Sequence, residues 1–259
     1  MPASSDDVVD TDARPVLLLL HGGGPGVDAE SNWASVRSPL SARFRCLAPD
    51  LLGFGTQIPG ATRIEGPRAW ALARARQVLD LLDREKLDRV YLVGNSAAGG
   101  AAALALLSMA PDRVHRAVVM GGGGTGPSPP SIPFYDDPTE ESMRATLGRL
   151  VADESVHSEL LDELAVIRLR QALRPGAESA FRSMFADVHD PPPIDLAHID
   201  TPILALHGER DRVSPVEVSV RLVDSLPDAR LKVVAGAGHW IHVDQPDAFC
   251  SLVGEFLSS

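Results

Sequence analysis

The sequence predicts an α/β protein, built on a mostly parallel, doubly wound sheet with a helical insertion. Short apolar runs alternate with helical patterns along most of the 259 residues, and this alternation is typical of parallel sheets. It stops between Gly121 and Pro193, where helical patterns follow one another without a strand between them. We therefore predict a core of residues 1–124 and 194–259 and a helical lid over residues 125–193.

The strand candidates are short segments rich in apolar residues. The first, VLLLL at residues 16–20, ends at a glycine-rich stretch, as expected of a strand that is buried on both faces of a parallel sheet. Similar runs predict five more strands, at residues 44–48, 90–93, 114–120, 203–206 and 231–234.

Helical patterns separate these strands. The core helices are expected at residues 67–82, 97–110, 215–226 and 246–257, and three of them begin with proline, which suits the first helical turn. Three more helices, at residues 139–152, 158–172 and 177–186, lie between two proline-rich stretches. An insertion placed after a core strand is typical of a lid over a site at the carboxyl ends of the strands.

Composition restricts the kind of partner. The net charge of −11, with no cluster of Lys or Arg, disfavours nucleic acid and anionic membranes and favours a small molecule. No apolar run reaches membrane-spanning length, and the acidic start lacks the features of a signal peptide, so we expect a cytoplasmic protein. Cys46 and Cys250 are isolated, which predicts neither a metal site nor a disulfide framework.

Ser96 is the candidate nucleophile. It directly follows the strand pattern ending in Gly94-Asn95 and precedes an alanine-rich helix, which is the strand, turn and helix context of a nucleophile elbow. Ala98 stands where the usual pentapeptide has its second glycine. By itself, this serine would fit a helix N-cap about equally well.

Asp211 and His239 complete a candidate triad. Asp211 follows the strand at residues 203–206, and His239 lies in a glycine-containing loop after the last strand. Taken singly, the aspartate would fit a helix cap and the histidine a structural role. The order Ser, Asp, His, with each residue after a strand, is that of the α/β-hydrolases. In such a triad His239 removes the proton of Ser96 while Asp211 orients the imidazole.

The glycine-rich stretch His21-Gly22-Gly23-Gly24-Pro25-Gly26 follows the first strand. A simple turn needs one glycine, whereas several allow backbone N–H groups to approach a substrate closely. We therefore predict an oxyanion hole formed by the backbone N–H groups of Gly23 and Ala97.

Together, the motifs HGGGPG, Ser31-Asn32, VGNS, MGGGGTGPS, HGERDRVSP and GHW resemble those of the meta-cleavage-product hydrolases. The resemblance covers about residues 15–257. It implies hydrolysis of a carbon–carbon bond in a 2-hydroxy-6-oxo-dienoate, which is an anionic product of catechol ring opening, without a cofactor or a metal. It also implies a possible homodimer.

The same resemblance assigns substrate contacts. Arg168 and Trp240 would contact the dienoate, Asn32 and Asn95 its polar head, and Gly22 and Gly24 are further expected contacts. An arginine suits an anionic substrate because its guanidinium binds a carboxylate through two hydrogen bonds. A solvated lid arginine and ordinary packing of the tryptophan are the alternatives.

Other functions use the same fold and triad. An ester, thioester or lactone hydrolase, a biosynthetic isomerase or cyclase, and a ligand-binding protein all remain open, since the fold does not fix the substrate. The sequence also leaves open whether Ser96 or a water attacks. The accepted substrate size is expected to depend on lid residues such as Ile132, Phe134, Met143 and Phe185.

Overall fold

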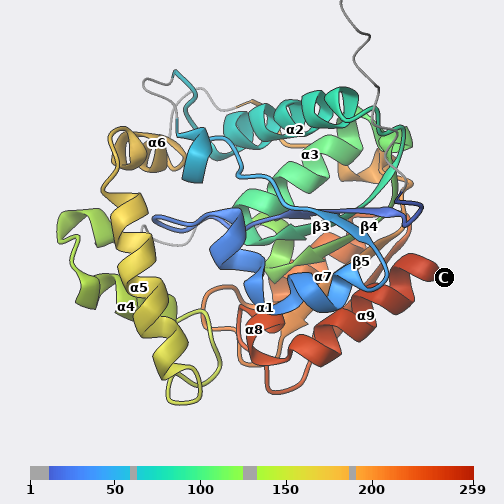
Figure 1. Ribbon diagram of the computed structural model, residues 1–259. Helices are drawn as coiled ribbons and strands as arrows, with labels where there is room; N and C mark the ends of the chain where they lie inside the picture. The colour runs from blue at the N-terminus through green and yellow to red at the C-terminus, as the bar shows by residue number, and fades with distance from the viewer. Residues whose placement is uncertain (1–11, 59–62, 125–132, 187–190) are drawn as a thin grey trace, which may run out of the picture.

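The computed structural model describes residues 12–58, 63–124, 133–186 and 191–259 (Figure 1). In this part of the chain, six strands form one all-parallel sheet in the order β2-β1-β3-β4-β5-β6. The predicted parallel sheet is confirmed. Its strands are β1 (Val16–Leu20), β2 (Arg45–Leu47), β3 (Val90–Asn95), β4 (Val114–Met120), β5 (Ile203–Gly208) and β6 (Ala229–Val234).

Helices cover both faces of the sheet. In Figure 1, α2 and α3 lie above it and α1 and α9 lie below it. The core helices are α1 (Ala29–Ser41), α2 (Pro67–Arg84), α3 (Ala101–Met109), α7 (Val216–Asp224), α8 (Ile241–Asp244) and α9 (Pro246–Ser258). The predicted helices at 67–82, 215–226 and 246–257 match α2, α7 and α9 to within two residues at each end.

Strand β1 is apolar throughout, because helices cover both of its faces. Leu18 and Leu20 pack into the cluster formed with α2 and α3, whereas Leu17 and Leu19 pack into the cluster formed with α1 and α9. All four leucines are fully buried. Because successive side chains of a strand point to opposite faces, a strand covered on both sides needs an apolar residue at every position.

The sequence analysis did not predict α1. Its buried residues Trp33, Val36 and Leu40 have the three- and four-residue spacing of one helix face. Polar residues and Pro39 lie between them, which weakens the helical pattern in the sequence. The side chain of Asp28 caps the helix by accepting a hydrogen bond from Ser31 N.

Within the part of the chain that the structure describes, three α-helices lie between β4 and β5, where the alternation stops in the sequence. They are α4 (Glu140–Gly148), α5 (Ser158–Ala172) and α6 (Ala177–Ser183), and Figure 1 shows them together beyond one end of the sheet. Met143 and Leu147 of α4 and Leu161 of α5 form part of one apolar cluster, which also includes Trp240 of the core. Helix α6 instead contributes Ala180 and Phe181 to the cluster formed with α2 and α3. We call residues 133–186 the insertion. The predicted lid begins at residue 125, which lies outside the described residues, and it ends at residue 193, shortly after another such stretch.

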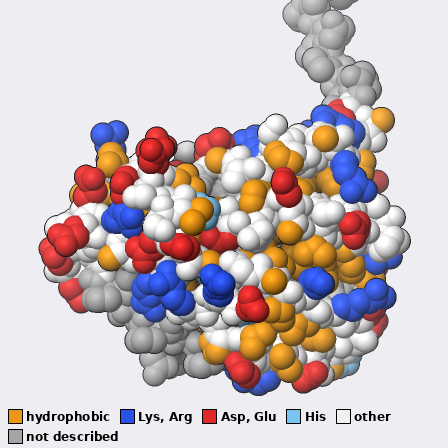
Figure 2. Space-filling view, turned by 90° about the horizontal axis from the view of Figure 1, so that it is seen from below, with side chains coloured by type: hydrophobic (Ala, Val, Ile, Leu, Met, Phe, Trp, Pro, Cys, Tyr) orange, Lys and Arg blue, Asp and Glu red, His pale blue; other side chains and the backbone are white. Residues whose placement is uncertain are grey.

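No helix of the described residues is long and apolar enough to cross a membrane. Acidic and basic side chains are interspersed on the face shown in Figure 2, so the net negative charge is not gathered into one patch there. Cys46 and Cys250 are free and only partly buried.

Candidate active site

Ser96 lies on a strained turn between a strand and a helix. It follows β3 and opens a single π-helical turn, Ser96–Gly100, which leads into α3. Its backbone φ is +54°, a conformation that residues other than glycine rarely adopt. A Cβ atom on Gly94 would lie 2.6 Å from Gly99 O, so the turn closes only because residue 94 has no side chain. The predicted nucleophile elbow is present.

Ala98 fits where the usual pattern has a glycine. It is buried, and a Cβ atom on Gly23 opposite would lie only 3.1 Å from its methyl group. The next residue, Gly99, has no such room, because a Cβ atom there would lie 2.1 Å from Leu20 O. The methyl group of Ala98 is therefore accommodated by the glycine that faces it.

The structure brings the three predicted triad residues together. His239 Nε2 lies 2.7 Å from Ser96 Oγ, and His239 Nδ1 lies 2.7 Å from Asp211 Oδ2. The three residues follow β3, β5 and β6. In the chain, 143 positions separate Ser96 from His239. This is the hydrogen-bonded geometry in which a histidine removes the proton of a serine hydroxyl.

The carboxylate of Asp211 is kept ionised by its hydrogen bonds. Its side chain is 1% exposed, and burial alone would raise its pKa. The hydrogen bond from His239 and those from Ser214 N and Val213 N, at 2.9 and 2.7 Å, outweigh burial and hold the pKa of Asp211 below its ordinary value. A charged Asp211 can stabilise an imidazolium on His239.

Asn32 organises the glycine-rich stretch. Its Oδ1 accepts hydrogen bonds from Gly22 N at 3.2 Å and from Asn95 Nδ2 at 3.1 Å, and its backbone oxygen accepts one from His242 Nε2 at 2.8 Å. Gly22, Gly23 and Asn32 all line the cavity beside Ser96, whereas Asn95 lies behind Asn32 and is not among the lining residues. The role of Gly23 N and Ala97 N as an oxyanion hole stays a prediction.

Arg168 of α5 is buried in the same cavity. It is 2% exposed, and its Nε and Nη2 atoms have no hydrogen-bond partner within the described residues. The guanidinium carbon lies 4.8 Å from the centre of the Trp240 ring, a cation–π contact. Burial lowers the pKa of Arg168 to about 10, so the group remains a cation at neutral pH.

A cavity that is open to solvent lies between the sheet and the insertion. Its empty space is about 790 Å³, including open solvent at its mouth. The core supplies Ser96, His239, Trp240 and the predicted contacts Gly22, Gly24 and Asn32. Its further lining residues include Ala97, Met143, Thr146, Leu147, Leu150, Arg168, Phe181, Phe185 and Val213.

Two of the four residues expected to control substrate size line this cavity. Met143 and Phe185 do so. Phe134 packs instead inside the apolar cluster of the insertion, and Ile132 lies outside the described residues. That cluster also contains Met143 and Trp240, which line the cavity, so the dependence of substrate size on the packing of Phe134 stays a prediction.

A sequence model described as the alpha/beta hydrolase family matches residues 17–252 of the chain. The chain belongs to the alpha/beta hydrolase family. This hydrolase is 38% identical to 2-hydroxy-6-oxo-2,4-heptadienoate hydrolase of Pseudomonas putida, over 96% of the chain and 91% of the relative. It is 36% identical to 2-hydroxymuconate semialdehyde hydrolase of Pseudomonas sp., over 96% of the chain and 89% of the relative.

Solved structures agree with this assignment. The hydrolase superimposes on 2-hydroxy-6-oxo-6-phenylhexa-2,4-dienoate hydrolase of Rhodococcus sp. with a TM-score of 0.83 and 30% identity, covering 95% of this chain and 91% of that one. A meta-cleavage product hydrolase of Pseudomonas fluorescens gives a TM-score of 0.79 and 31% identity, with coverage of 95% and 90%. The resemblance to the meta-cleavage-product hydrolases is confirmed.

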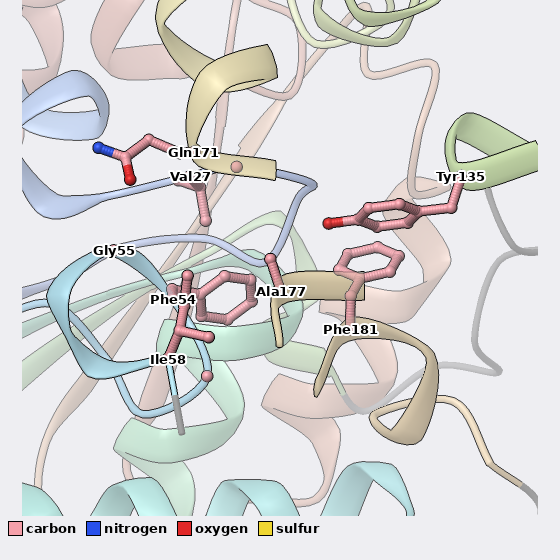
Figure 3. A pocket seen from close by; sticks show the side chains of 10 residues that line it. Val27, Phe54, Gly55, Ile58, Tyr135, Gln171, Ala177 and Phe181 are labelled. Atoms are coloured by element: carbon pink, nitrogen blue, oxygen red, sulfur yellow. The ribbon is translucent and has the colours of Figure 1, made fainter. Parts of the chain in front are cut away.

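A second, smaller pocket of the hydrolase adjoins the cavity (Figure 3). Val27 and Phe181 line both. Apart from Gln171 and the hydroxyl of Tyr135, its labelled lining is apolar, with Phe54 and Ile58 opposite the insertion. The side chains of Val27 and Phe181 thus lie between the cavity that contains Ser96 and this smaller apolar pocket.

The sequence analysis missed the role of His21, the first residue of the glycine-rich stretch. It is fully buried. Its Nδ1 lies 2.8 Å from Gly22 O, and its Nε2 accepts a hydrogen bond from Leu51 N at 2.9 Å. Because only a neutral imidazole can donate on one side and accept on the other, His21 must be uncharged to connect these loops.

This requirement predicts a loss of stability in acid. Burial lowers the pKa of His21 from 6.5 to about 4, so the unfolded hydrolase binds the proton more readily between these values. Neutral His21 therefore makes its full contribution to the free energy of unfolding above pH 6.5. This contribution, about 3 kcal/mol, is lost as the pH falls toward 4. Urea unfolding at several pH values measures it.

The His21→Asn variant is expected to flatten this pH dependence. His198→Gln is the control, because the His198 side chain is 83% exposed. An equal loss of stability with pH in the wild type and in His21→Asn would contradict the prediction.

Proposed function

We propose that this hydrolase cleaves a carbon–carbon bond in a 2-hydroxy-6-oxo-dienoate formed by ring opening of a catechol. The observation that carries the proposal is the buried guanidinium of Arg168 in the cavity that contains Ser96 and His239. Within the described residues, its Nε and Nη2 atoms have no hydrogen-bond partner. The curated relatives named for dienoate and semialdehyde hydrolysis support it.

Arg168 explains why the substrate should be an anion. Burying a cation without a partner is costly, and such a cost is typical of sites that await a ligand. The Nε and Nη2 atoms that lack partners are adjacent donors of the guanidinium fork, which matches the two oxygens of a carboxylate. We assign Arg168 to the carboxylate end of the substrate and Trp240 to the chain beside it.

The chemistry follows from the triad. After the bound enol tautomerises to the ketone, Ser96 Oγ attacks the carbonyl distal to the carboxylate, while His239 takes its proton. The carbon–carbon bond then breaks and His239 protonates the leaving carbon. Water releases the acyl group as a carboxylic acid. Gly23 N and Ala97 N are the proposed donors to the oxyanion.

The insertion is the proposed lid. Met143, Leu147 and Phe185 supply an apolar wall, which suits the uncharged end of a dienoate and excludes water from the bond being cleaved. We retain the proposed lid boundaries 125–193. A homodimer and a cytoplasmic location are further parts of this proposal.

The ester or lactone hydrolases are the main alternative, since the triad alone would serve them equally well. An uncharged ester makes no use of Arg168. Comparing a dienoate with an uncharged aryl ester therefore separates the two functions.

The test is to mix the purified protein with a yellow ring-fission dienoate and to follow the loss of its visible absorbance. An aryl ester is measured in parallel, and Ser96→Ala is the control. We expect turnover of the dienoate that requires Ser96. Cleavage of the ester alone would overturn the proposal, and inertness toward both would favour a binding or biosynthetic role.

A further inference from the structure

Asp244 is a buried carboxylate that the chemistry above does not use. It ends α8, five residues after His239, and its side chain is only 4% exposed. Its Oδ2 accepts hydrogen bonds from Gly238 N at 2.7 Å and from Ala152 N at 3.0 Å, and its Oδ1 lies 3.0 Å from His157 Nε2. A buried carboxylate with three donors is held firmly in place.

These donors belong to two different parts of the chain. Gly238 directly precedes His239, whereas Ala152 and His157 belong to the insertion, 92 and 87 positions from Asp244. One carboxylate therefore fixes the peptide that leads into the triad histidine and, at the same time, the stretch between α4 and α5.

The residue that follows His239 is also hydrogen-bonded to the insertion. Trp240 N donates a hydrogen bond to Leu150 O at 2.7 Å, and Leu150 lines the cavity. A Cβ atom on Gly238 would lie 2.7 Å from Ala152 N, so the two backbones touch. Both neighbours of His239 are thus attached to residues 150–152 of the insertion.

The loop of the triad acid contacts the same stretch. Arg212, which follows Asp211, donates hydrogen bonds through Nη2 to Gly148 O at 2.7 Å and to Val151 O at 2.9 Å. Residues 148–152 therefore lie between the loops of Asp211 and His239 and are bound to both. Among these contacts, Asp244 supplies the only side chain that bonds directly to the His239 loop and to the insertion.

We propose that Asp244 is a positioning residue for His239, which it acts on through Gly238 N, and that it makes the geometry of the triad depend on the insertion. The proposal rests on the proposed function only for the choice of the dienoate as substrate. Asp244 is not among the residues that line the cavity, so its loss should lower kcat and leave KM nearly unchanged.

The test compares Asp244→Ala and Asp244→Asn with the wild type. Two readouts are used: the rate at which a fluorophosphonate labels Ser96, and kcat and KM for the dienoate and for an aryl ester, each per labelled serine. We expect Asp244→Ala to lower the labelling rate and kcat by about 10–100-fold, since small misplacements of reacting groups have effects of this size. KM should stay within about twofold of the wild type.

Matched variants separate positioning from stability. Glu159→Gln removes an exposed acidic side chain from the same insertion and should leave both rates unchanged. His157→Gln keeps a donor toward Asp244 and should retain more activity than His157→Ala. If Asp244→Ala does not fold, the same measurements are made on Asp244→Asn, which preserves the shape of the side chain.

Unchanged rates per labelled serine in a folded Asp244 variant would overturn the inference, even if its melting temperature fell, because Asp244 would then serve stability alone. An equal loss in Glu159→Gln would also overturn it. Failure of the proposed function looks different: the wild type would label and cleave the ester but leave the dienoate intact, and the Asp244 comparison would proceed on the ester.

Discussion

Asp211→Asn should lower kcat for the dienoate by about four orders of magnitude. An amide that donates to His239 Nδ1 would force the proton of the imidazole onto Nε2, which then faces Ser96 Oγ as a donor rather than as a base. The variant also loses the negative charge that stabilises the imidazolium. Stopped-flow measurement of the loss of dienoate absorbance gives the rate.

Asp224→Asn is the matched control. It makes the same chemical change at an exposed position of α7 and should leave kcat unchanged. A reduction of less than about tenfold in Asp211→Asn would contradict the assigned role of Asp211.

Arg168→Gln should lower kcat/KM for the dienoate by about two to four orders of magnitude. Each charge-assisted hydrogen bond contributes about 1.5–3 kcal/mol, and the substrate carboxylate would lose two of them. Turnover of an uncharged aryl ester should change by less than about threefold. Steady-state kinetics on both substrates measures this difference in selectivity.

The same variant should not reduce stability. Arg168 is buried and its Nε and Nη2 atoms are unpaired within the described residues, so replacing the cation removes a cost of burial. Arg170→Gln, at an exposed position two residues along α5, is the control for both measurements. Equal losses on the dienoate and the ester, or a large fall in melting temperature, would show that Arg168 has a structural role instead.

Features with a local signature could be predicted from the sequence. The strands β1 and β4 are rich in apolar residues, and their predicted bounds match the structure at both ends. Helix α1 was missed because polar residues and Pro39 lie between its buried apolar residues. Sequence patterns report which faces are buried, and they fail where such residues obscure the period of the apolar positions.

The triad followed from position, because each of its residues lies within a few residues of the carboxyl end of a strand of the parallel sheet. Arg168 and Trp240 came from the family resemblance alone, and the structure now places both in the cavity. Asp244 and His21 were missed, since their roles depend on backbone groups 92 and 30 positions away. Unlike the triad residues, these pairs have no characteristic order or spacing in a single sequence.

The most direct test of carbon–carbon bond hydrolysis is to identify the products of one turnover in ¹⁸O-labelled water. We expect a new carboxylic acid that contains one labelled oxygen, together with a shortened 2-hydroxydienoate, and no products from Ser96→Ala. Loss of colour without a labelled carboxylic acid would mean that the enzyme only isomerises its substrate, and carbon–carbon bond hydrolysis would be ruled out.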